Sequence, residues 1–266
     1  MMPSNPPALL YHKVDFNWEV GVTWVTPTLF RRQIEQLHRH GWRTSLSGDG
    51  ESTATAHKRV IIAFDDGYES VYTEALPVLE RLGFKAMVFI PTGYLGRRND
   101  WDHQLLGRKH KHLTRAQLVE LDRLGWLIGS HGISHTDLTR LDRVRLREEL
   151  IRSKGLLSDI LGKEVDWVSF PFGRYNRRTV EMALECGYRA ALVPGASRIQ
   201  TTPKFQVVSA TPVYLWDSPT TLMRLVRKAE LSGRGRRIYG FINVLNRGTG
   251  IWRTIFPSAS SDRFLD

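Results

Sequence analysis

The chain has 266 residues, of which 41% are apolar and 24% charged, so it can form one large domain or two small ones. Lysine and arginine exceed aspartate and glutamate by 38 − 27 = 11, which favours an anionic partner such as a membrane surface, a nucleic acid or an acidic glycan. No zinc-finger or RNA-binding signature is present, which argues against nucleic acid, and the single cysteine, Cys186, excludes an intrachain disulfide.

Short apolar runs alternate with longer stretches of helical periodicity along most of the chain. Residues 1–8 are expected to be flexible. Strands are expected at 9–11, 60–64, 85–90, 126–128, 165–170, 189–193 and 206–210. Helices are expected at 27–40, 70–82, 114–124, 142–161 and 176–186, each followed by a glycine that is typical of a helix end.

This alternation of strands and helices predicts βα units and a parallel sheet. Six or seven such units favour a closed or nearly closed barrel over an open doubly wound sheet. The missing Gly-x-Gly-x-x-Gly after the first strand further weakens the dinucleotide-binding alternative. We therefore expect an α/β fold, a distorted (β/α) barrel of about seven parallel strands, forming a single domain over residues 9–217.

Residues 218–266 have a different character and are interpreted as a C-terminal extension. Lysines and arginines gather in 224–237, and residues 238–252 mix aromatic and aliphatic side chains with few charges. Such a segment could lie on an anionic membrane surface, or it could be a closing helix with a basic face.

The chain as given has no signal-peptide pattern at its start and no apolar run of the roughly 18 residues that span a bilayer. We therefore expect a cytoplasmic protein, with peripheral attachment to the inner membrane face as one alternative.

Two adjacent carboxylates, Asp65 and Asp66, stand where the apolar run 60–64 meets Gly67. Neighbouring like charges repel and desolvate badly unless a cation lies between them. The pair therefore indicates a cation site, with an ordinary surface turn as the alternative.

His131 and His135 follow the apolar run 126–128, so this pair is also expected just after a strand. A His-x-x-x-His spacing lets two imidazoles converge on one ion, and two histidines with one carboxylate are typical of a hydrolytic metal site. In a chain with nine histidines the spacing could also arise by chance. Both pairs and the turn at 170–173 are expected at the C-terminal ends of barrel strands, where βα barrels place their active sites.

The stretch 97–112 contains Trp101 and many basic residues. It is either a solvated insertion or a rim loop that shapes a substrate groove, with Trp101 in contact with substrate.

Together these motifs resemble the polysaccharide deacetylases of carbohydrate esterase family 4, over about residues 9–217. The resemblance implies that Asp65 is the general base and that Asp66, His131 and His135 bind one divalent metal ion, zinc or else nickel, cobalt or iron. It also implies a substrate-binding wall formed by Pro171, Phe172 and Gly173.

The N-terminal stretch, Leu10-Tyr11-His12 followed by the segment 25–42, resembles the branch that acts on poly-N-acetylglucosamine exopolysaccharides. In that branch the equivalent of His12 is the proton donor, although by the residues alone His12 is more simply read as structural. Ser169 departs from the family pattern, which has an arginine there that orients the catalytic aspartate. The Leu-x-His motif that supplies the acid in many members is absent, which leaves His12 as the candidate.

The implied reaction is hydrolysis of N-acetyl groups from an amino-sugar-containing glycan or a lipid-linked saccharide. The backbone N–H of Tyr68 is a candidate donor to the oxyanion. Two alternatives stay open: a metal-dependent amidase or esterase acting on a non-sugar substrate, and an inactive relative that only binds glycans.

Overall fold

The computed structural model describes residues 6–16, 23–46, 58–99, 110–195, 197, 199 and 201–232. Seven parallel strands close into a barrel, because the first strand pairs with both the second and the last of them. In order around the barrel they are β1 (Ala8–Tyr11), β5 (Lys58–Phe64), β6 (Met87–Ile90), β7 (Leu127–Ser130), β8 (Trp167–Ser169), β9 (Ala190–Pro194) and β10 (Gln206–Pro212). The predicted barrel of about seven parallel strands is therefore confirmed.

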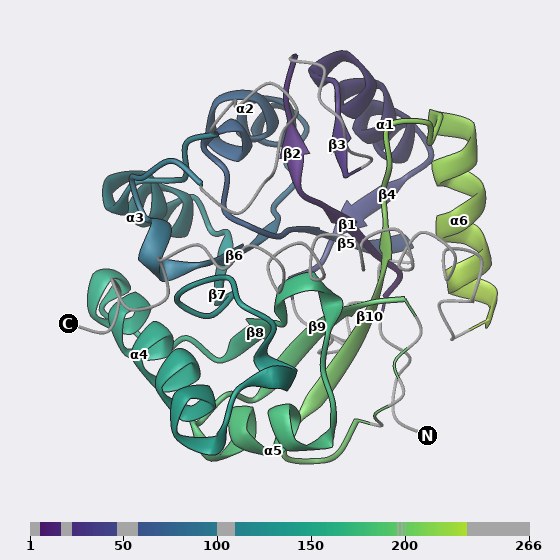
Figure 1. Cartoon of the computed structure of the whole chain (residues 1–266). Helices are drawn as coiled ribbons and strands as arrows, with labels where there is room; N and C mark the ends of the chain where they lie inside the picture. The colour runs from purple at the N-terminus through teal and green to yellow at the C-terminus, as the bar shows by residue number, and fades with distance from the viewer. Residues whose placement is uncertain are drawn as a thin grey trace.

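Helices lie around the outside of the barrel (Figure 1). They are α1 (Pro27–Arg39), α2 (Leu76–Arg81), α3 (Arg115–Arg123), α4 (Arg143–Leu161), α5 (Arg177–Glu185) and α6 (Pro219–Ser232). The expected helix at 70–82 is divided, because its first part is the π-helix η1 (Val71–Ala75). The glycine after each of the first five helices has a positive φ, as a helix-ending glycine should.

Three short strands and three 3₁₀ helices complete the described part of the chain. β2 (Lys13–Val14) and β3 (Trp24–Val25) pair with each other, and β4 (Trp42–Thr44) pairs with the first half of β5. The 3₁₀ helices are η2 (Thr92–Tyr94), η3 (Leu138–Arg140) and η4 (Pro171–Gly173). The sequence did not predict these three strands, because a strand of two or three residues is too short to show an alternating pattern.

The core has two layers because successive strand residues point to opposite faces. One layer fills the barrel, and all its fully buried members come from barrel strands: Ala8, Leu10, Ile61, Ala63, Met87, Phe89, Trp167, Ala190, Leu192, Val208 and Ala210. The residues between them face outward and pack against the helices. Small alanines on four strands suit the narrow interior of a seven-stranded barrel.

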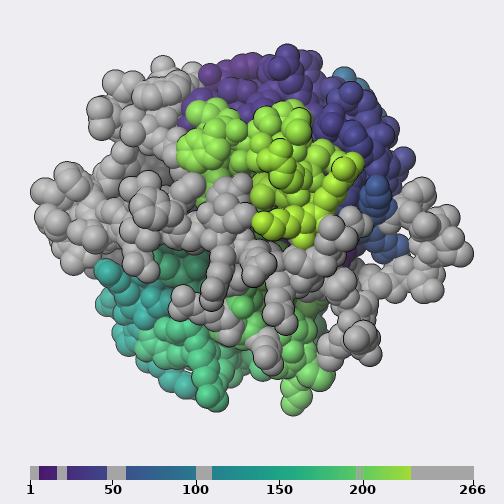
Figure 2. Space-filling model, turned by 90° about the vertical axis from the view of Figure 1, so that its right-hand side faces the viewer, coloured from purple at the N-terminus to yellow at the C-terminus, as the bar shows by residue number. Residues whose placement is uncertain are grey.

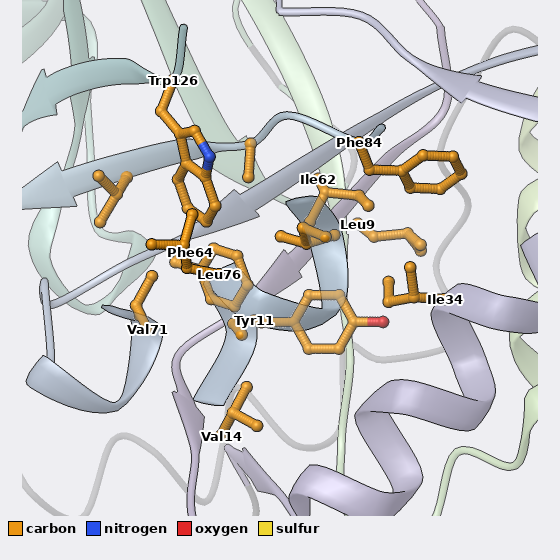
Figure 3. Close-up of a cluster of buried hydrophobic side chains, with 14 of the residues drawn as sticks. Leu9, Tyr11, Val14, Ile34, Ile62, Phe64, Val71, Leu76, Phe84 and Trp126 are labelled. Atoms are coloured by element: carbon orange, nitrogen blue, oxygen red, sulfur yellow. The ribbon is translucent and has the colours of Figure 1, made fainter. Parts of the chain in front are cut away.

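The outer layer around β1 and β5 is rich in aromatic residues (Figure 3). The ring of Phe64 stacks on Trp126 with centroids 6.1 Å apart and lies 5.6 Å from Tyr11. The Tyr11 hydroxyl donates to Gln33 Oε1 at 3.1 Å, which ties β1 to α1. Phe64 is the last residue of β5, so this packing fixes the point at which the two aspartates leave the strand.

Helix α6 lies against α1 on the outside of the barrel (Figure 2). Its side chains Leu222, Met223 and Val226 are buried in the outer core layer. Residues 219–232 thus form a closing helix, the second alternative given by the sequence for this stretch, whereas residues 233–266 lie outside the described residues. Within the described ranges, no helix is long and apolar enough to cross a membrane.

Candidate active site

Asp65 and Asp66 stand where β5 leaves the barrel. The Asp65 amide still donates to the Tyr11 carbonyl at 3.0 Å, which continues the pairing of β5 with β1. At Asp66 the chain turns into the left-handed region with φ of 68°, and Gly67 follows at 58°. Both aspartates are buried, at 4% and 7% exposure, so the surface-turn alternative for this pair is excluded.

Asp66, His131 and His135 converge on one point. Asp66 Oδ1 lies 3.0 Å from His135 Nε2 and 3.4 Å from His131 Nε2. The three ligand atoms lie within 4.8 Å of one another, and all three residues are buried. Two imidazole nitrogens and one carboxylate oxygen are a ligand set that suits zinc and similar divalent ions, so these residues fit a metal.

The orientation of His131 also suits a metal ligand. Its Nδ1 donates to the backbone carbonyl of Ser169 at 2.8 Å, and a carbonyl can only accept, so Nδ1 carries a proton. Nε2 is therefore the nitrogen directed at Asp66 and the one able to bind a metal when the ring is neutral. Such a hydrogen bond behind a ligating histidine fixes both its tautomer and its ring orientation.

The two neighbouring aspartates differ in protonation behaviour. Burial raises the pKa of Asp65 above its ordinary value, and the charges of His131 and His12 only partly oppose this. Burial would raise the pKa of Asp66 as well, but His135 and His131 beside it bring that pKa well below its ordinary value. Two adjacent carboxyl groups with pKa values moved apart suit different roles, one as a permanent anion and the other as a proton acceptor.

Ser169 connects Asp65 to this centre. Its hydroxyl donates to Asp65 Oδ2 at 3.1 Å, while its carbonyl holds His131. Within the described ranges Asp65 Oδ1 has no hydrogen-bond partner, although it is buried. One oxygen is thus held by the protein and the other is available to a ligand.

The turn at 170–173, the third motif after the aspartate pair and the histidine pair, lies beside His135. The ring of Phe172 lies 4.7 Å from the ring of His135, and Pro171 is buried. A Cβ on Gly173 would lie 2.3 Å from Pro194 Cγ, so only glycine fits there. Among the described residues, the non-glycine residues with positive φ are Asp66, His135 and Phe172, one in each motif. Such strain costs of order 1–3 kcal/mol per residue and is concentrated at functional sites.

Two of the remaining candidates lie on elements next to the aspartates. His12 directly follows β1, the neighbour of β5. Burial raises the pKa of Asp65, and the charges of His131 and then His12 partly oppose this rise. At Asp66 the charge of His12 also lowers the pKa, but less than His135 does. His12 Nδ1 is buried with no hydrogen-bond partner in the described part of the chain. The Tyr68 ring is buried and stacks on His112 with centroids 4.9 Å apart. Trp101 lies outside the described residues.

A cavity of about 580 Å³ lies elsewhere, between α1 and α6. Its lining includes Gln36, His40, Arg224 and Arg227, and none of the lining residues belongs to the Asp–His–His centre. The chemistry of the centre, and not the size of this cavity, therefore locates the candidate active site.

Sequence reasoning missed the polar side chains behind the histidines. Glu149 and Ser153, one turn apart on α4, both hydrogen-bond to the stretch 132–134, and Arg174 donates to Asp137 at 2.7 Å. The signal for the first two was their place on the same helix face as Leu146 and Leu150, where apolar residues are expected.

A family model described as polysaccharide deacetylase matches residues 52–191, more than half of the chain. The chain belongs to the polysaccharide deacetylase family. The matched range contains the aspartate pair, the histidine pair and the third motif. Relatives of the chain include proteins named as polysaccharide and chitin deacetylases, and this deacetylase is an enzyme of that class, carbohydrate esterase family 4.

Individual relatives agree with this assignment. The deacetylase is 31% identical over 202 residues to YxkH of Bacillus subtilis (strain 168), a protein named as a candidate polysaccharide deacetylase, covering 73% of this chain and 67% of that protein. It is 24% identical over 136 residues to the poly-β-1,6-N-acetyl-D-glucosamine N-deacetylase of Staphylococcus aureus (strain MRSA252), covering 50% of this chain and 46% of that enzyme.

Solved structures show the same fold. The Streptococcus pyogenes deacetylase PplD, solved with acetate, matches with a TM-score of 0.70 and 23% identity over 84% of this chain and 98% of that one. IcaB from Ammonifex degensii matches with a TM-score of 0.65 and 21% identity over 84% of this chain and 97% of that one. At these identities the structures establish the barrel fold of the deacetylase and nothing finer.

Proposed function

We propose that this deacetylase hydrolyses N-acetyl groups from amino-sugar residues of a glycan or a lipid-linked saccharide, with one divalent ion held by Asp66, His131 and His135. The observation that carries the proposal is this buried triad directly beside Asp65, a second carboxyl group with a raised pKa and one unpartnered oxygen. A divalent ion bound there supplies a Lewis acid that polarises an acyl carbonyl and acidifies water.

Asp65 is the residue that takes the proton from the attacking water. Its Oδ2 is anchored by Ser169, which leaves Oδ1 to accept that proton. A general base works best when its pKa lies near the working pH, and burial moves the pKa of Asp65 in that direction.

His12 donates a proton to the departing amine. Its unpartnered Nδ1 and its effect on the pKa of both aspartates support a place beside the reacting group. The backbone N–H of Tyr68, two residues after Asp66, is the proposed donor to the oxyanion. Phe172 packs on His135 and is proposed to contact the sugar.

The substrate class is supported by relatives. The Staphylococcus aureus enzyme is named for poly-β-1,6-N-acetyl-D-glucosamine, which makes N-acetylglucosamine oligomers the first substrates to test. Peripheral attachment to an anionic membrane through residues 233–266 fits the net charge of +11 and would suit a lipid-linked substrate. Sedimentation with phosphatidylglycerol vesicles tests this attachment, and an equal result for a chain ending at Ser232 would exclude a role for those residues.

The activity test measures acetate released from N-acetylglucosamine oligomers and from small acetamides, with apoprotein reloaded with zinc, cobalt or nickel. We expect release from the oligomers in the loaded protein alone. His131→Ala should lose metal, Asp65→Asn should keep metal and lose turnover, and His12→Ala should keep metal with reduced turnover. His40→Ala, which changes the exposed histidine that directly follows α1, is the matched control.

Each alternative predicts a different result. Release from small acetamides but not from the oligomers would indicate a non-sugar amidase. Metal and glycan binding without any release would indicate an inactive glycan-binding relative. Full turnover by Asp65→Asn would remove Asp65 from the role of base.

A further inference from the structure

Helix α4 holds the turn that joins the two histidine ligands. We propose that Glu149, on the buried face of α4, is a positioning residue that sets metal affinity by fixing the backbone between His131 and His135. The inference rests on the proposed metal centre, because it assigns Glu149 a role toward those ligands.

Three hydrogen bonds run from the turn to the Glu149 carboxylate. Oε2 accepts the amide of Ile133 at 2.7 Å and the amide of Ser134 at 3.1 Å, and Oε1 accepts the Ser134 hydroxyl at 2.6 Å. Glu149 is 7% exposed, and the described residues offer it no ion pair. A buried carboxylate without a cation is costly unless its oxygens are well hydrogen-bonded, so these three bonds are what allow it to remain there.

The other side of the turn is held by different groups. The Gly132 carbonyl accepts the amide of Thr92 at 2.9 Å and the hydroxyl of Ser153 at 3.0 Å, and the Ile133 carbonyl accepts the amide of Gly93 at 3.0 Å. The carbonyls therefore have several donors, whereas the amides of Ile133 and Ser134 depend on Glu149. Removing its carboxylate leaves two buried amides without a hydrogen-bond acceptor, which is costly for the backbone of the turn.

The backbone of the turn needs such support. Gly132 has a φ of +75°, and a Cβ there would lie 3.1 Å from Glu149 Oε2, so the carboxylate occupies the space that a side chain would take. His135 has a φ of 51°, a strained value for a residue with a side chain. Without Glu149 the turn can relax, and the Nε2 atoms of the two histidines would lose their fixed separation.

A purely structural role for Glu149 would lower stability and leave metal affinity unchanged. A positioning role changes metal affinity in protein that is still folded. Groups that orient metal ligands typically contribute 10- to 100-fold in affinity. Metal affinity of the full chain, measured separately from activity, thus distinguishes the two roles.

The experiment compares the parent with Glu149→Ala, Glu149→Gln and the control Glu148→Ala. Glu148 is the neighbouring residue of α4, and within the described ranges it has no hydrogen bond or ion pair. Each apoprotein is titrated with Co²⁺, whose absorption spectrum reports both affinity and coordination geometry, and the unfolding midpoint in urea is measured in parallel.

We expect Glu149→Ala to weaken Co²⁺ binding at least 10-fold and to change the absorption bands, with Glu148→Ala within twofold of the parent. Glutamine keeps one oxygen for the two amides and can donate its amide to the Ser134 hydroxyl, so Glu149→Gln should restore most of the affinity. It is also the informative variant if Glu149→Ala does not fold.

Folded Glu149→Ala with parental Co²⁺ affinity and spectrum would overturn the inference. So would an equal loss in Glu148→Ala, or a Glu149→Gln variant as weak as Glu149→Ala. A parent chain that binds no metal at all would instead overturn the proposed function, so the two failures are distinguishable.

Discussion

Replacing Ser169 with alanine tests how Asp65, the proposed base, is held. The substitution removes the one hydrogen bond that the described residues give to the Asp65 carboxylate, at 3.1 Å, while the carbonyl that holds His131 stays in place. A hydrogen bond to a charged group contributes about 1.5–3 kcal/mol. Asp65 is 4% exposed, so water replaces the hydroxyl poorly and the upper half of this range applies.

At 1.36 kcal/mol per tenfold change in rate, the upper half of this range predicts a fall in kcat/KM of about 45- to 160-fold. Metal content should stay at the parental level. The Ser169 hydroxyl lowers the pKa of Asp65 against the larger effect of burial, so its loss should move the acid limb of the pH–rate profile to higher pH.

The assay is acetate release from N-acetylglucosamine oligomers across pH, with metal content measured on the same samples. Ser158→Ala is the matched control, because it also removes a serine hydroxyl that makes a hydrogen bond. Ser158 lies near the C-terminal end of α4, and its hydroxyl accepts the Val165 amide. Turnover of Ser169→Ala within twofold of the parent at equal metal content would refute the positioning argument. Loss of metal together with turnover would refute the separation of the two roles of Ser169.

Two further predictions concern the third motif and its neighbours. Gly173→Ala should lower the free energy of unfolding in urea by about 2–4 kcal/mol, since Gly173 has a φ of +60° and a Cβ there would meet a proline of β9. The control Gly155→Ala, in open space on α4, should be neutral or stabilising. Equal urea midpoints for the two variants would contradict this prediction. Burial raises the pKa of Asp137, but hydrogen bonds from Thr139 and Arg174 outweigh burial and bring that pKa below its ordinary value. The ionised Asp137 carboxylate therefore stabilises the folded state above about pH 4, and this stabilisation is lost as pH falls further. Arg174→Ala should flatten the loss of stability between pH 5 and pH 3, measured as urea midpoints, and an unchanged pH dependence would exclude the pair from acid unfolding.

The sequence was sufficient for the barrel because its signals are local and repeated. Each long strand is an apolar run, and each of the first five helices ends at a glycine whose positive φ the structure confirms. The motifs were predicted to lie on one rim because the C-terminal ends of parallel strands share an edge. The structure brings Asp66, His131 and His135 together at that edge.

Contacts between distant segments were not predictable in the same way. Ser169 reaches Asp65 across 104 positions, and only the order of strands around the barrel determines this contact. Glu149 falls on a helix face with Leu146 and Leu150, yet a helical pattern does not say which turn an unexpected acid will contact. Helix α6 was not predicted as a separate element, because the sequence analysis grouped its basic residues with residues 233–237 in one C-terminal extension.

The turn between Asp65 and Asp66, and not their chemistry, explains the different roles that we propose for them. The left-handed backbone at Asp66 lets two adjacent carboxylates serve one site, with Asp66 among the imidazoles and Asp65 at the Ser169 hydroxyl. Strain of the same kind recurs at His135 and Phe172, so each motif adopts a backbone that its own residues disfavour. Such conformations persist only when the surrounding structure holds them, and for the histidine turn that support is the buried carboxylate of Glu149.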